Sequence, residues 1–76
     1  MTTGEKIKNF RLINNLSQAK LGSMLGVSAV MISQYENGKR SLPLEALIRL
    51  TEYYGTSADY LLGLTDRQEP YPRRRE

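Results

Sequence analysis

The stretch SQAKLGSMLGVSAVMISQYENGKR, residues 17–40, predicts two short helices joined by a tight corner. The first is expected over residues 18–25, because the Ser17 hydroxyl can cap its free N–H groups and Gly26 tolerates the left-handed backbone that ends many helices. The second is expected over about 28–37, with Ser28 as its cap and Gly38 at its end. A short helix, a Gly-Val-Ser corner and a second short helix are typical of helix-turn-helix geometry.

The second helix of this pair is predicted to have two faces of different character. At about 100° per residue, Ile32 lies at the centre of a buried face that also holds Ser28, Tyr35 and Glu36. A carboxylate near the core is tolerable only if a cation neutralises it. The opposite face carries a valine, a serine and two amides, and two cations follow the helix: Val30, Ser33, Gln34, Asn37 and Lys39-Arg40. This face predicts contact with a partner, while a plain solvated surface stays open for each of its residues.

The remaining sequence predicts further short helices and no strand. They are expected over about 3–14, from Pro43 to about Tyr54, and over 58–62 after a Ser57 cap. Their inward-facing side chains are expected to include Ile7, Phe10 and Ile13 in the first of these helices, and Leu44, Leu47, Ile48 and Thr51 in the second. The predicted fold class is therefore all-α, a compact five-helix bundle over residues 1–66. Residues 67–76, which hold two prolines and a basic cluster, are expected to form a flexible tail.

Composition argues against several classes of function. The 76 residues contain neither cysteine nor histidine, which removes disulfides, thiolate or imidazole metal sites and Ser-His-Asp chemistry. The acids are scattered singly, and the chain has no glycine-rich phosphate loop. We therefore expect no enzyme, no cofactor, no metal and no small-molecule substrate. With no apolar run near the roughly 18 residues of a membrane span and no signal peptide, the expected location is cytoplasmic, away from membranes.

Charge is distributed unevenly along the chain. Residues 1–40 hold six Lys/Arg and two Asp/Glu, which gives +4, and residues 41–66 hold one Arg and four acids, which gives −3. Residues 67–76 hold four Arg and two Glu, which gives +2. A basic front half and a basic tail favour a face for a polyanion, although a solvated surface with chance asymmetry remains an alternative.

Residues 5–64 resemble the phage repressor and Cro-type helix-turn-helix family, also called xenobiotic-response-element-like regulators. The motif residues are Ser17-Gln18, Leu21-Gly22, Gly26-Val27-Ser28, Ile32-Ser33, Glu36, Gly38-Lys39-Arg40, and Leu44-Glu45 with Leu47. Gly22 and Thr51 stand where alanine is common in that family. The resemblance implies a lambda repressor-like domain and a sequence-specific double-stranded DNA-binding transcriptional regulator, expected to be a repressor. It also implies that the third helix, about 28–37, enters the major groove.

The resemblance implies a role for each residue of the site. Gln18 would bind a phosphate, and Arg11 would pair with Glu36. Val30 suits a thymine methyl, and the Gln34 amide matches N6 and N7 of adenine. The full set of expected DNA-binding residues is Gln18, Ser28, Ala29, Val30, Ser33, Gln34, Asn37, Lys39 and Arg40.

A second function stays open, a protein-interaction module such as the antitoxin of a toxin-antitoxin pair. The segment 53–64 has more apolar and aromatic residues than one short helix needs: Tyr53, Tyr54, Tyr60, Leu61, Leu62 and Leu64. They could form a homodimer or receive a partner, or they could cover the domain's own core. The arginines of the tail, 73–75, could add phosphate contacts, and a plain solvated tail stays open as the alternative.

Overall fold

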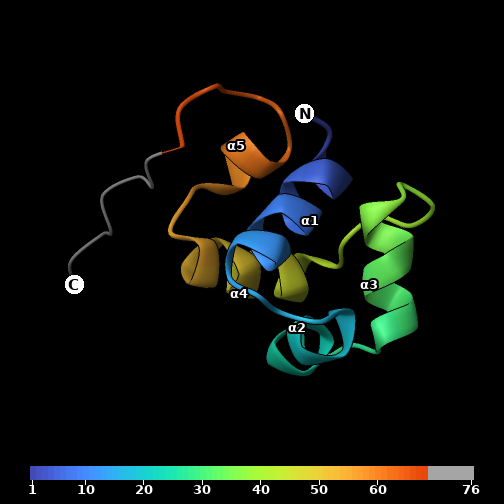
Figure 1. The fold of residues 1–76 in the computed structure, drawn as a ribbon. Helices are drawn as coiled ribbons and strands as arrows, with labels where there is room; N and C mark the ends of the chain where they lie inside the picture. Colours follow the sequence, from blue (N-terminus) through green and yellow to red (C-terminus); the bar gives the residue numbers. More distant parts are fainter. Residues whose placement is uncertain (69–76) are drawn as a thin grey trace.

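The computed structural model describes residues 1–68 and contains five helices and no strand within that range (Figure 1). The helices are α1 (Thr3–Ile13), α2 (Gln18–Leu25), α3 (Ala29–Glu36), α4 (Leu44–Tyr54) and α5 (Ala58–Leu61). The predicted all-α, five-helix class is thereby confirmed. Of the predicted tail, residues 69–76 lie outside the described part of the chain. Within residues 1–68, none of the helices combines the length and apolar character that crossing a bilayer requires.

Local side-chain chemistry fixes where the helices begin. The hydroxyls of Ser17, Ser28 and Ser57 each accept a backbone N–H from the residue three positions on, at 2.9, 3.2 and 3.1 Å. Thr2 and Glu5 form a reciprocal capping box on α1, which the sequence analysis did not predict. Pro43 lies at the N-cap of α4 rather than inside its first turn. Four of the five helices therefore begin with a local side-chain cap, and α4 begins at Pro43 without one.

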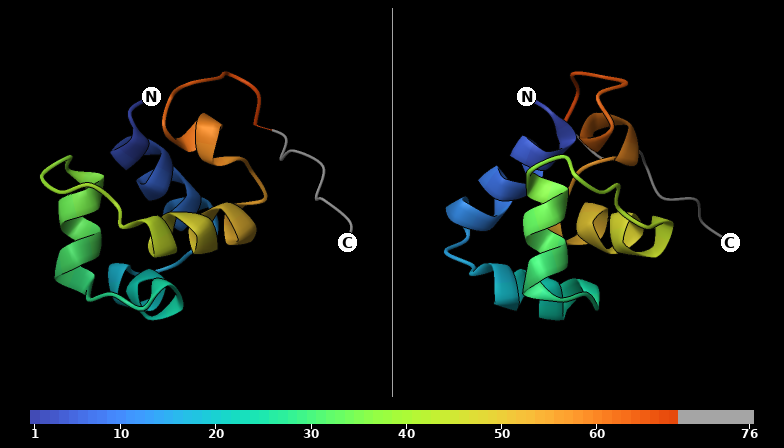
Figure 2. Two further views of the ribbon diagram at one scale, coloured as in Figure 1. Left: turned by 180° about the vertical axis from the view of Figure 1, so that it is seen from behind. Right: turned by 90° about the vertical axis from the view of Figure 1, so that its right-hand side faces the viewer.

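One apolar core joins all five helices. Its members are Ile7, Phe10, Leu21, Leu25, Ile32, Tyr35, Ala46, Leu47, Leu50, Tyr60 and Leu61. α3 packs against both α2 and α1, while α4 and α5 close the other side. The side view in Figure 2 places α3 at the front of the molecule, so one of its faces meets the core and the other meets solvent.

Three predicted core positions are wrong. The buried face of α4 is Ala46, Leu47 and Leu50, whereas Leu44 and Ile48 are 72% and 51% exposed. The buried stripe is thus rotated by roughly 100°, one residue step, from the predicted one. Ile13 is exposed because it is the last residue of α1, where the chain turns away.

Ser28 does not lie on the buried face of α3 as predicted. It precedes the helix as an exposed, extended N-cap residue, and its hydroxyl accepts the Met31 N–H of the first turn.

Candidate nucleic-acid interface

The corner between α2 and α3 depends on two glycines. Gly26 ends α2 with a φ of 75°, a left-handed conformation that glycine adopts at little cost. At Gly22, an added Cβ would stand only 2.5 Å from the Val27 carbonyl oxygen, so the missing side chain lets the corner approach α2 closely. The alanine usual in the resembling family would need a slightly wider corner.

The ion pair expected between Arg11 and Glu36 is present and ties α1 to the end of α3. Arg11 donates through Nε to Glu36 Oε2 at 2.7 Å and through Nη2 to Glu36 Oε1 at 3.2 Å. The side chains are 12% and 3% exposed, respectively. Donation to the Glu36 carboxylate raises the pKa of the Arg11 guanidinium. The two parallel hydrogen bonds and the burial hold this pair in one geometry and so fix the position of the end of α3.

Gln18 has a role that the sequence analysis did not assign to it. Its Nε2 amide donates to Glu36 Oε1 at 3.3 Å, which links the first residue of α2 to the Arg11–Glu36 pair. Arg11 also donates from Nη1 to the Leu16 carbonyl at 3.0 Å. The ion pair therefore fixes α1, α2 and α3 relative to one another.

A shallow hollow of about 360 Å³ lies against the outward face of α3. Val30 on this face is 67% exposed, although it is an apolar side chain. The hollow is lined by seven of the nine predicted DNA-binding residues: Gln18, Ala29, Val30, Ser33, Gln34, Asn37 and Lys39. These lining residues combine one cation, four amide or hydroxyl side chains and two methyl-bearing side chains, with no carboxylate.

The structure separates the other two predicted residues from this hollow. Ser28 is occupied as the cap of α3. Arg40 lies in the loop after α3 and donates through Nε to Gln34 Oε1 on that helix at 3.1 Å. No sequence pattern predicted this contact. Asn37 Nδ2 similarly donates to Ser33 Oγ at 3.4 Å.

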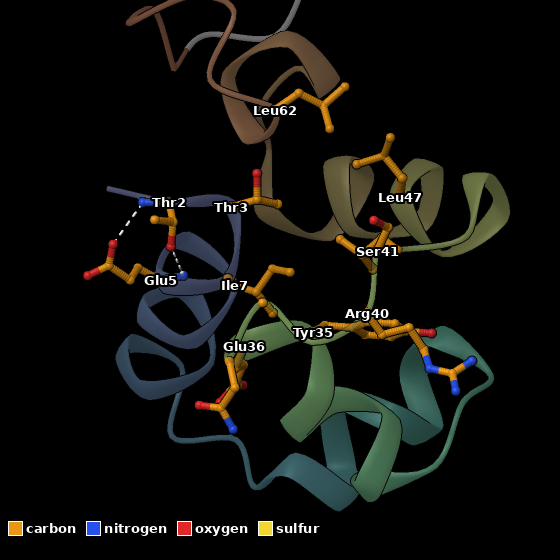
Figure 3. A pocket seen from close by; sticks show the side chains of 14 residues that line it. Thr2, Thr3, Glu5, Ile7, Tyr35, Glu36, Arg40, Ser41, Leu47 and Leu62 are labelled. Atoms are coloured by element: carbon orange, nitrogen blue, oxygen red, sulfur yellow. Dashed lines mark hydrogen bonds between the residues drawn. The ribbon is translucent and has the colours of Figure 1, made fainter.

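A larger cavity of about 530 Å³ lies elsewhere, where α1, α4 and α5 meet the loop after α3 (Figure 3). Ile7, Tyr35, Leu47 and Leu62 give it an apolar lining. The Arg40 side chain borders it but is directed away from Leu47 and Leu62 in the close-up. We locate the candidate interface at the smaller hollow, because the outward residues of α3 line it together with a cation and no carboxylate, whereas Glu5 and Glu36 line the larger cavity.

Sequence reasoning missed Gly4, which lets α1 approach the end of α3. An added Cβ at Gly4 would lie 2.6 Å from the Tyr35 carbonyl oxygen and still nearer that of Glu36. The only signal in the sequence was a glycine in the first turn of a helix, and this signal does not identify which part of the chain packs against it.

The segment 53–64 divides between core and surface. Tyr60 and Leu61 are buried, and Tyr54 stacks on Phe10 with ring centroids 4.8 Å apart. Tyr53, Leu62 and Leu64 are 52%, 52% and 73% exposed. Part of the apolar surface expected for a partner thus covers the domain's own core.

A family model described as Helix-turn-helix matches residues 7–61. The chain is 30% identical over 71 residues to an uncharacterized HTH-type transcriptional regulator of Bacillus subtilis, YobD, covering 93% of this chain and 63% of that protein. It is 36% identical over 67 residues to the control protein C.SmaI of Serratia marcescens, covering 84% of this chain and 80% of that protein.

Among solved structures, the P22 c2 repressor in complex with a synthetic operator superimposes with a TM-score of 0.76. The aligned sequences are 40% identical, and the match covers 82% of this chain and 94% of that one. The chain therefore spans nearly the full length of that solved repressor chain but less than two thirds of the Bacillus relative.

Proposed function

The chain belongs to the helix-turn-helix family, and from that membership we propose that it is a sequence-specific double-stranded DNA-binding transcriptional regulator. The observation that carries this proposal is the hollow on α3, where seven predicted contact residues converge. Repression is the finer part of the proposal and draws on the likeness to a repressor solved on its operator. A DNA target also fits the cytoplasmic location expected from the sequence.

The chemistry of the hollow suits a major groove. Val30 and Ala29 offer methyl groups to a thymine methyl, and Ser33 and Gln34 offer hydrogen-bonding groups to base edges. Gln18 stands at the N-terminus of α2, where backbone N–H groups favour a phosphate. Its amide has a second N–H beyond the one given to Glu36, so the phosphate role and the structural role are compatible.

Asn37 and Lys39 follow α3 and would grip the DNA backbone. Both are exposed, and the Asn37 amide keeps a second N–H beyond the one given to Ser33, so each residue has a donor for a phosphate oxygen. Such contacts set affinity and register without reading sequence.

We propose a homodimer through the exposed part of segment 53–64. Tyr53, Leu62 and Leu64 lie on the surface while their neighbours Tyr60 and Leu61 fill the core. The same surface would serve the alternative function, a protein-interaction module with a different partner. Size exclusion separates the two proposals: a dimer that binds DNA alone supports the regulator, and a monomer that needs a second protein supports the module.

The test of DNA reading compares two variants on two duplexes. A preferred duplex is first selected from a randomised pool, and its scrambled version serves as the reference. Gln34→Ala should weaken binding to the preferred duplex by about 1–3 kcal/mol and hardly change binding to the scrambled one. Lys39→Ala should weaken both by a similar factor, because a phosphate carries no base information. Equal weakening of both duplexes by Gln34→Ala would contradict base reading by this residue.

A further inference from the structure

Arg40 does not line the hollow on α3, but its side chain is bonded to Gln34, which does. Its Nε–H donates to Gln34 Oε1 at 3.1 Å, joining the loop after α3 to the outward face of that helix. Both residues are accessible, since Gln34 is partly buried and Arg40 is exposed. This bond directs the Arg40 guanidinium toward the outward face of α3, where bases would lie, and not only toward phosphates.

This bond changes what Gln34 presents to a base. A primary amide reads adenine by accepting from N6 and donating to N7, so it needs its oxygen as well as its NH₂ group. With Oε1 turned toward Arg40, the outward group is the NH₂ donor. Guanine presents two acceptors, O6 and N7, on its major-groove edge. A donor-only amide therefore fits guanine, whereas the N6 amino group of adenine opposes it with a donor of its own.

We propose that Arg40 is a specificity-determining residue that orients the Gln34 amide, so that α3 selects guanine over adenine at the base it faces. This inference rests on the proposed DNA binding. It replaces the adenine contact expected from the sequence, because an isolated glutamine can present either end of its amide. The remaining guanidinium nitrogens, Nη1 and Nη2, stay available for a second contact to the same guanine or to a phosphate.

The experiment measures a ratio within each variant, so that changes in overall affinity cancel. The base that Gln34 faces is first located as the position of the selected duplex where Gln34→Ala alone loses its preference. At that position, dissociation constants are measured for guanine, adenine and inosine at one salt concentration. Inosine retains O6 and N7 and lacks only the minor-groove amino group, so it should bind like guanine.

The full chain should prefer guanine over adenine by about 5- to 150-fold, the equivalent of one good base contact. Arg40→Ala should bring this ratio close to one, because the freed amide can turn its oxygen to adenine. Lys39→Ala is the matched control, since it removes a neighbouring cation. It should weaken binding to all three duplexes and leave the ratio unchanged.

The outcomes distinguish this inference from the function on which it rests. If the randomised pool yields no preferred duplex, the proposed function fails. If a duplex is selected but the base is adenine, if no position responds to Gln34→Ala, or if Arg40→Ala keeps the guanine preference, the orienting role of Arg40 is wrong and the DNA-binding function stands.

Discussion

Removal of the Arg11 side chain should destabilise the domain far more than loss of a surface charge. Arg11→Ala leaves the Glu36 carboxylate, only 3% exposed, without its two guanidinium hydrogen bonds. Breaking a buried pair in this way costs about 3–5 kcal/mol. Gln18 still donates one hydrogen bond to Glu36, so we expect the lower end of that range, about 3 kcal/mol.

That loss is large for a chain of this size. At roughly 0.05–0.15 kcal/mol per residue, 76 residues give a free energy of unfolding of about 4–11 kcal/mol. Urea denaturation followed by circular dichroism measures the change. With a slope of about 1 kcal/mol per molar, the midpoint should fall by about 3 M, and a weakly stable variant would already be partly unfolded in buffer.

A second variant separates the stranded charge from lost packing. Arg11→Ala/Glu36→Gln carries a neutral amide that can still bond to Gln18, so it should unfold at a higher urea concentration than Arg11→Ala alone. An exposed pair would contribute less than about 1 kcal/mol. A midpoint in Arg11→Ala within about 0.5 M of the unaltered chain would therefore refute the reasoning.

Three further perturbations test other parts of the structure. Gly4→Ala should lower the free energy of unfolding by about 1–3 kcal/mol, because the added Cβ meets backbone carbonyls at the end of α3. Lys8→Ala, on the exposed side of α1, is the control and should leave the urea midpoint nearly unchanged. Tyr35→Phe should leave the melting temperature unchanged or raise it, since the buried hydroxyl has no hydrogen-bond partner within residues 1–68, and a clear drop would mean that the hydroxyl is satisfied. The logarithm of the association constant for duplex DNA should fall by about 0.9 per unit of log salt concentration for each phosphate contact, and Lys39→Ala should lower the slope by about one such contact. An association constant that does not change with salt concentration would exclude phosphate contacts.

The sequence by itself determined the helices and their ends. Ser17, Ser28 and Ser57 cap the helices that they were expected to cap, and Gly26 ends α2. These signals are readable because each is a hydrogen bond or a backbone preference spanning four residues or fewer. The register of the helix-turn-helix motif and the Arg11–Glu36 pairing came from the resemblance of many residues in one alignment.

Only the tertiary structure decided how each helix is turned and which surface groups meet. The buried stripe of α4 is rotated one step from its sequence pattern, so Ile48 faces solvent and Ala46 the core. The rotation of a helix about its axis is set by the elements packed against it, which lie far away in the sequence. For the same reason, the approach of Gly4 to α3 could not be predicted. The bond from Arg40 to Gln34 spans only six residues, but it depends on the path of the loop after α3. A charge pattern does not encode that path, so the sequence gives the residues of the site and the fold gives their orientation.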